Sequence, residues 1–91
     1  MTYEWDPAKA AANVRKHRVS FEEAASVFLD PVALTFPDPD HSKDEDRAIT
    51  IGRSARQRVL FVAHTERDRI RIISARVATQ REQRQDEEGI E

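Results

Sequence analysis

Small apolar residues recur at helical spacing near the start of the chain. Asp6 and Pro7 open this segment, because an aspartate side chain accepts hydrogen bonds from the free amides at a helix N-terminus and proline suits the first helical position. We predict a helix from Pro7 to Lys16 or His17. Its apolar side chains are small enough to lie close against a sheet: Ala8, Ala11, Ala12 and Val14.

A second helical pattern begins at Ser20. The segment from Ser20 to Glu23 has the form of a capping box, in which Ser20 caps the helix and Glu23 reaches back to the amide of Ser20. The helix should end before Pro31, because a residue that precedes proline avoids the helical region. Its apolar residues again recur at helical spacing: Phe21, Ala24, Ala25 and Phe28.

The rest of the chain reads mainly as strands. Residues 47–52 alternate polar and apolar side chains, as a half-buried strand does, whereas residues 59–63 form a continuous apolar run that is typical of a central strand. Polar turns at 54–57 and 66–69 and an exposed loop at 37–44 separate the strands. The predicted strands are 3–5, 32–36, 47–52, 59–63 and 70–77, and a polar helix follows at 78–88.

This order of elements predicts an α+β fold with one domain over residues 1–91. Consecutive strands joined by short turns favour an antiparallel meander, and the two early helices would pack on one face of it. The other face is left for a partner, a substrate or the C-terminal helix. The acidic tail from about residue 86 is expected to fray.

The charges are segregated along the chain, although 35% of the residues are charged and the net charge is only −2. Residues 47–85 hold ten arginines against three carboxylates, a balance of +7, whereas residues 38–46 and 86–91 each carry −4. A concentrated basic region can attract phosphate even in an acidic protein. The alternative interpretation is ordinary solvated arginine on strands and a helix.

Several kinds of chemistry are excluded or disfavoured by the composition. The chain has no cysteine and only two glycines, so it has neither a thiolate site nor a phosphate-binding glycine loop. Its three histidines lack zinc-ligand spacing, and the acidic loop lacks the pattern of a calcium-binding loop. We therefore expect no metal and no cofactor. No signal peptide or membrane-spanning run is visible, which predicts a cytoplasmic protein.

Arginine, lysine, histidine and carboxylates remain, and they suffice to cleave RNA without metal. The 2′-hydroxyl of RNA is itself the nucleophile, so the protein has to align it with phosphorus and stabilise the charge that builds up there. Arginine suits this task, because its planar fork matches two phosphate oxygens. Arg76 is the first candidate, because it ends the last strand at the rim of the sheet, and Arg47 and Arg67 lie at strand ends from which they could converge with it. An ion pair with Glu82 or Glu45 is the structural alternative for Arg76.

Other candidates would move protons or bind the RNA backbone. Lys16 and His17 end the first helix, where cations are also favoured by the helix dipole alone. Glu45 is a weaker candidate for the base. His64 lies beside the apolar run and favours a structural role. The candidate RNA-binding residues are Lys9, Arg53 and Arg58.

An ordered set of short motifs extends from Tyr3 to Glu82. It consists of Trp5-Asp6-Pro7-Ala8-Lys9, Asn13, Lys16-His17, Val19-Ser20-Phe21-Glu22-Glu23-Ala24, Val27-Phe28, Asp30-Pro31, Asp38, Glu45-Asp46-Arg47, Ile51-Gly52-Arg53-Ser54, Arg71-Ile72-Ile73-Ser74-Ala75-Arg76, Ala78 and Glu82. This set resembles the BrnT family of type II toxins. Arg18 and the turn at Gln57-Arg58 depart from it, because the family often has glycine there, and the tail lacks an expected aromatic residue.

The resemblance implies a RelE-like ribonuclease fold and metal-independent RNA cleavage. It also implies a cognate BrnA-like antitoxin that binds DNA, a complex of two toxins with two antitoxins, and contact with operator DNA only through the antitoxin. One alternative is a non-catalytic binding module that acts only within a transcription-repressing complex. Direct DNA binding is a third hypothesis, disfavoured because no helix has a sufficiently basic face.

Overall fold

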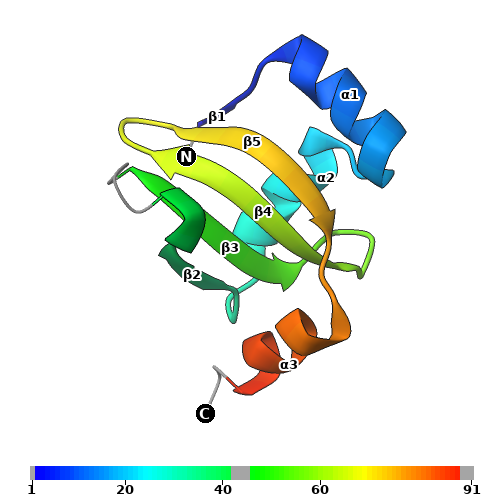
Figure 1. Cartoon of the computed structure of the whole chain (residues 1–91), viewed down its shortest axis with the longest axis vertical. Coiled ribbons are helices and arrows are strands. Elements are labelled where there is room, and N and C mark those ends of the chain that lie inside the picture. The colour runs from blue at the N-terminus through cyan, green and yellow to red at the C-terminus, as the bar shows by residue number, and fades with distance from the viewer. Residues whose placement is uncertain (1, 42–45, 89–91) are drawn as a thin grey trace.

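The computed structural model describes residues 2–41 and 46–88, and it is drawn in Figure 1. One five-stranded sheet has the strand order β1-β5-β4-β3-β2. The strands β2 to β5 form the predicted antiparallel meander, and β1 pairs in parallel with β5 at one edge. The elements are β1 (Tyr3–Glu4), α1 (Pro7–His17), α2 (Phe21–Ser26), the 3-10 turn η1 (Val27–Leu29), β2 (Leu34–Pro37), the 3-10 turn η2 (Pro39–His41), β3 (Arg47–Arg53), β4 (Val59–Glu66), β5 (Ile70–Val77) and α3 (Gln80–Glu88).

The predicted order of helices and strands is confirmed, and the differences lie at their ends. The α-helical part of the second helix stops at Ser26 and continues as η1, after which Asp30 is extended, as the proline that follows requires. β4 runs three residues beyond the predicted end, because its polar end still pairs with β3 and β5. α3 begins at Gln80 rather than Ala78, since the amide of Ala78 still bonds to the carbonyl of Val59. It reaches Glu88, the predicted end of this helix.

The ends of α1 follow from the local sequence. The carboxylate of Asp6 accepts hydrogen bonds from the amides of Ala8 and Lys9, as predicted for an N-cap. At the other end Arg18 adopts the left-handed conformation, with φ 59° and ψ 32°, and its amide bonds to the carbonyl of Val14. Gln57 also has a positive φ of 67°. Both positions therefore need the backbone geometry that glycine adopts most easily.

Arg18→Gly is expected to raise the free energy of unfolding by about 0.5–1 kcal/mol. Glycine removes the left-handed strain, which costs about 1–2 kcal/mol. This gain exceeds the free-energy cost that follows from the greater conformational entropy of glycine in the unfolded chain. Urea denaturation followed by circular dichroism measures the change. Arg15→Gly, inside the same helix, is the matched control and should destabilise the protein by about 1 kcal/mol. Equal destabilisation of both variants would contradict this account of the cap.

The capping box at the start of α2 forms only in half. The hydroxyl of Ser20 accepts a hydrogen bond from the amide of Glu23 at 3.0 Å, as predicted. The carboxylate of Glu23 does not reach back to Ser20, because both of its oxygens are engaged elsewhere. It accepts from Ser54 Oγ at 2.7 Å and from Arg58 Nε at 2.9 Å, and Arg58 Nη2 contacts its other oxygen. This buried contact ties α2 to the β3–β4 turn.

The sheet carries an apolar layer on each face. On one face α1 and α2 pack against β4 and β5, with Phe21, Val27, Leu60 and Ile72 at the centre of the larger cluster. On the other face Ile49, Ile51, Val59 and Ala63 form a smaller cluster with Ala78, which leads into α3. The helix-covered face thus has the main core, and the α3 face is left partly open for a site.

Two buried polar side chains lie where the helical layer meets the sheet. Asn13 of α1 donates to the carbonyls of Val19 and Ala75 and accepts from the amide of Ala75, so it joins α1 to β5. His64 is fully buried, and its Nε2 lies 2.7 Å from Thr50 Oγ1. Burial lowers the pKa of His64, and this favours the neutral ring. The structural role expected of His64 agrees with this placement.

Candidate active site

A hollow of about 440 Å³ lies on the α3 face of the sheet. Its floor is formed by residues that pair with one another on neighbouring strands. Ile49 pairs with Ala63, Ala63 pairs with Ser74, and Phe61 pairs with Arg76. Their side chains therefore lie on the same side of the sheet. The rim is formed by the segment after β2, the start of β3 and α3. The remaining lining residues are Phe36, Asp38, Pro39, Asp40, Arg47 and Glu82.

Arg76 lies in this hollow with its guanidinium group oriented by two contacts. Its Nη1 and Nη2 donate to the two carboxylate oxygens of Glu82 at 2.7 and 2.8 Å, and its Cζ lies 4.1 Å from the centre of the Phe61 ring. The hydrogen bond from Arg76 is the main reason that the pKa of Glu82 lies below its ordinary value. The ion pair with Glu82, which was the structural alternative for Arg76, is therefore present, and the carboxylate of Glu82 occupies both donors of the guanidinium fork in the hollow.

Glu82 also belongs to the start of α3. Its Oε1 accepts a hydrogen bond from the amide of Thr79 at 2.8 Å, and its own amide donates to Thr79 Oγ1 at 3.2 Å. This reciprocal pair is a capping box, so the position of Glu82 is set by local sequence. The same carboxylate consequently links the N-terminus of α3 to Arg76.

Arg47 enters the hollow from the first residue of β3. Its Nε lies 3.3 Å from Asp38 Oδ2, and Asp38 is only 5% exposed. The other oxygen of Asp38 accepts from the amide of Asp40 at 3.0 Å. The hollow thus brings together Arg47 and Arg76, each beside a carboxylate.

Arg67 does not line this hollow, so the expected convergence of three arginines in one cavity is not found. Its Nε is paired with Asp46, and it lines a separate pocket at the β4–β5 turn. Arg67 follows the end of β4, whereas Arg76 is near the far end of β5, so the antiparallel pairing places them at different ends of the sheet. The predicted turn at 66–69 and strand at 70–77 already imply this separation, because the turn of an antiparallel hairpin and the far end of its second strand lie at opposite ends of the sheet.

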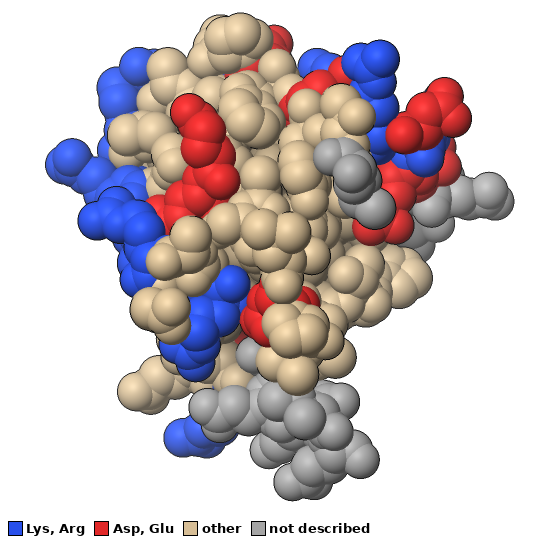
Figure 2. All heavy atoms as spheres, turned by 180° about the vertical axis from the view of Figure 1, so that it is seen from behind, with Lys and Arg blue, Asp and Glu red and all other residues tan. Residues whose placement is uncertain are grey.

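Lys16 and His17 end α1, which packs against the helix-covered face of the sheet. Neither lines the hollow, whose walls come from the opposite face. Figure 2 shows the helix-covered face, with Lys and Arg side chains gathered along the side where α1 runs. This placement argues against direct proton transfer by Lys16 or His17 at Arg76, although the helix-end role of such cations fits it.

The three candidate RNA-binding residues are dispersed. Lys9 is exposed near the start of α1, and Arg53 Nη1 donates to the carbonyl of Gln57 within the β3–β4 turn. Arg58 is held by Glu23 and by the carbonyl of Arg18 at 3.0 Å, so it has a structural role. None of them lines the hollow. Glu45 lies outside the described residues.

Sequence reasoning did not single out Ser74 or Phe61 as part of the site. Ser74 is two residues before Arg76 on β5, and Phe61 stands opposite Arg76 on β4. The two-residue period of a strand could have indicated Ser74 once Arg76 was chosen. Phe61 required the register of β4 against β5, which the alternation alone does not provide.

Within residues 2–40 and 46–84, whose side chains the structure describes, no three histidine, aspartate or glutamate side chains gather closely enough to hold a metal ion. The described helices also include none that is long and apolar enough to cross a bilayer. Asp38, Asp40 and Asp46 of the acidic loop are described, whereas its other acidic residues lie outside the described part.

The fold and the hollow define the class of protein. It is a small α+β protein in which guanidinium groups on the partly open face of the sheet are oriented by carboxylates, and such groups are suited to binding an oxyanion. The sequence pattern of the family described as ribonuclease toxin, BrnT, of type II toxin-antitoxin system matches residues 5–82. The chain therefore belongs to the BrnT family, and it is a ribonuclease toxin of a type II toxin–antitoxin system with an antitoxin as its partner.

Comparison of structures gives a consistent fold. The crystal structure of the Brucella abortus ribonuclease toxin BrnT is similar with a TM-score of 0.68 and 24% sequence identity, over 88% of this chain and 100% of that one. A search of curated protein sequences gave no significant match. The similarity to the Brucella protein shows the mixed fold with its five-stranded sheet.

Proposed function

We propose that the chain is a RelE-like endoribonuclease that cleaves RNA without metal, in the hollow lined by Arg47 and Arg76. The observation that carries the proposal is the two-point contact of Arg76 with the carboxylate of Glu82. A carboxylate presents two oxygens in much the same way as a phosphate does, and a guanidinium fork binds either one with two parallel hydrogen bonds. A scissile phosphate would take the place that Glu82 holds beside Arg76.

The reaction needs little covalent chemistry from the protein. The 2′-oxygen forms a bond to phosphorus while the bond from phosphorus to the 5′-oxygen breaks, which leaves a 2′,3′-cyclic phosphate and a 5′-hydroxyl. Arg76 and Arg47 would stabilise the extra negative charge on the phosphate oxygens during this step. The packing of Phe61 and Glu82 against Arg76 orients the guanidinium group before RNA binds, so less ordering is needed during the reaction.

A base has to accept the proton of the 2′-hydroxyl, and an acid has to supply one to the 5′-oxygen. Glu45, two positions before Arg47, remains the candidate base from the sequence, and Asp40 is a second candidate because it lines the hollow. General acid–base catalysis of this kind contributes about 10²–10⁴ in rate. Because Lys16 and His17 lie in the helical layer, we assign them no step here.

Cleavage in excess EDTA tests the proposal. Purified protein is incubated with single-stranded RNA and with the same oligonucleotide carrying 2′-deoxy residues throughout. We expect cleavage of the RNA alone, with cyclic-phosphate ends visible by mass spectrometry. Loss of cleavage in EDTA with recovery in magnesium would contradict the metal-independent mechanism. Binding without cleavage would favour the non-catalytic module instead.

The antitoxin is proposed to be BrnA-like and to bind DNA, with the toxin contacting operator DNA only through it. A complex of two toxins with two antitoxins is the expected assembly. The family membership supports the existence of the partner, while its DNA-binding domain and the stoichiometry rest on the resemblance. Light scattering of the co-purified complex and a gel shift with each component alone would test these points.

A further inference from the structure

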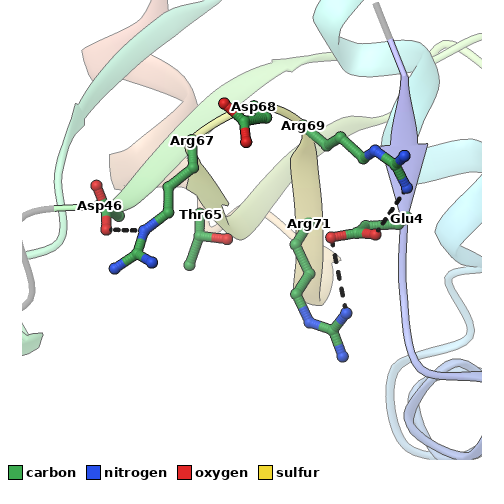
Figure 3. A pocket seen from close by; sticks show the side chains of 7 residues that line it. All are labelled: Glu4, Asp46, Thr65, Arg67, Asp68, Arg69 and Arg71. Atoms are coloured by element: carbon green, nitrogen blue, oxygen red, sulfur yellow. Dashed lines mark hydrogen bonds and ion pairs between the residues drawn. The ribbon is translucent and has the colours of Figure 1, made fainter.

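A second pocket, of about 510 Å³, lies at the β4–β5 turn and is lined by three arginines. Figure 3 shows Arg67 on one side of it and Arg71 on the other, with Thr65 between them and Arg69 above. Three acidic residues, Glu4, Asp46 and Asp68, complete its lining. The arginines alternate along the chain in the segment Arg67-Asp68-Arg69-Ile70-Arg71, and the proposed catalytic hollow does not account for this run.

Strand register connects this pocket to the hollow. Arg47, Thr65 and Arg71 stand opposite one another on β3, β4 and β5, so they form one row across the sheet. Arg47 lines the hollow, whereas Thr65 and Arg71 line the pocket. Thr65 lies four residues along β4 from Phe61, which is about 13 Å on the same face. A strand of RNA that crosses this face would therefore meet the two places with different phosphates.

The two ion pairs that Glu4 makes in the pocket are long and exposed. Arg69 Nη1 lies 3.5 Å from Glu4 Oε2 and Arg71 Nη1 lies 3.8 Å from Glu4 Oε1, so one carboxylate serves two guanidinium groups. The side chains of Arg69 and Arg71 are 60% and 48% exposed. Exposed pairs of this kind contribute little free energy, because water and salt screen them. A phosphate could replace Glu4 at low cost, unlike Glu23 in its buried contact with Arg58.

We propose that Arg69 and Arg71 bind a phosphate of the RNA strand that is distinct from the scissile one, with Glu4 as the carboxylate that RNA displaces. The inference rests on the proposed function for the identity of the polyanion. It makes the β4–β5 turn a substrate-binding subsite that raises affinity and fixes the direction in which the strand crosses the sheet. Chemistry remains in the hollow, so removal of this subsite weakens binding rather than turnover.

The test measures binding and cleavage separately. Binding of a fluorescent 2′-O-methyl oligonucleotide, which lacks the attacking hydroxyl, is followed by anisotropy from low to moderate salt. Arg69→Ala with Arg71→Ala should weaken binding about fivefold to tenfold and reduce the salt slope by about 0.7 for each phosphate that the variant no longer neutralises. In cleavage of ordinary RNA, KM should rise by a similar factor with kcat unchanged. Arg15→Ala, at an exposed position of α1, is the control for loss of charge and should change neither RNA binding nor KM.

Glu4→Gln provides a prediction of opposite sign. It removes the competing carboxylate and retains a side chain of the same shape, so RNA binding should tighten about twofold to fivefold and the salt slope should steepen. A purely structural role of the Glu4 ion pairs would instead lower the melting temperature and leave binding unchanged. Unchanged binding in both the double arginine variant and Glu4→Gln would overturn the subsite, even if the protein cleaves RNA normally.

Failure of the proposed function has a different signature. In that case the unmodified protein neither cleaves RNA nor binds the oligonucleotide in a salt-dependent way. If the arginine variants weaken antitoxin binding and leave RNA binding unchanged, the pocket belongs to the protein interface and the subsite is wrong. Equal binding of DNA and RNA oligonucleotides would still support a phosphate subsite, because it recognises no 2′-hydroxyl.

Discussion

Arg76→Ala is expected to lower kcat for RNA cleavage by about 10²–10³-fold, the effect typical of removing one preorganised donor to a developing negative charge. The guanidinium of Arg76 is held by Glu82 and lies over Phe61 inside the hollow, so its fork is already oriented where the phosphate would bind. KM should change much less, because the rest of the RNA-binding surface remains. Steady-state cleavage of a defined oligonucleotide and growth on expression in cells without the antitoxin measure the effect.

Three variants serve as controls for this result. Arg76→Lys keeps the charge and removes the fork, so its activity should lie between those of the wild type and Arg76→Ala. Glu82→Gln removes the carboxylate that the phosphate would displace and keeps Arg76 itself, so it should not lower kcat as Arg76→Ala does. Arg15→Ala should behave as the wild type. Normal growth inhibition by a folded Arg76→Ala protein would remove Arg76 from the catalytic site.

Glu23→Gln is expected to lower the free energy of unfolding by about 2–3 kcal/mol at pH 7. Glu23 is 7% exposed, and its carboxylate accepts hydrogen bonds from Ser54 and Arg58, which are more than thirty residues away in the chain. The amide of glutamine can accept only at one end and leaves the guanidinium of Arg58 without its counter-charge. Urea denaturation measures the destabilisation, and exposed Glu22→Gln in the same helical turn is the matched control.

The destabilisation should depend on pH in a defined direction. The hydrogen bond from Arg58 is the largest cause that holds the pKa of Glu23 below its ordinary value of 4.5. The carboxylate therefore contributes stability that is fully present above about pH 4.5 and is lost as the pH falls through the lower pKa of the folded state. The difference between wild type and Glu23→Gln should shrink from pH 7 to pH 3. A constant difference would mean that shape, not charge, explains the effect.

The sequence by itself determined the local structure of this protein. Asp6 and Pro7 specify the start of α1, Ser20 specifies that of α2, and the alternation in residues 47–52 identifies a half-buried strand. These signals depend on hydrogen bonds within a few residues or on the period of a single element. The positive φ of Arg18 is also a local feature, since it closes the end of α1, and it falls at a position where the family that the chain resembles often has glycine.

Tertiary structure decided which distant groups meet. Glu23 was predicted to bond to its own helix, but burial against the β3–β4 turn gives it Ser54 and Arg58 instead. Arg47 and Arg76 lie on β3 and β5, which do not pair with each other, yet the strand order places both in one hollow. Charge patterning identifies a basic region without revealing which cations share a cavity, because strand order, register and burial are set by the packing of the whole chain.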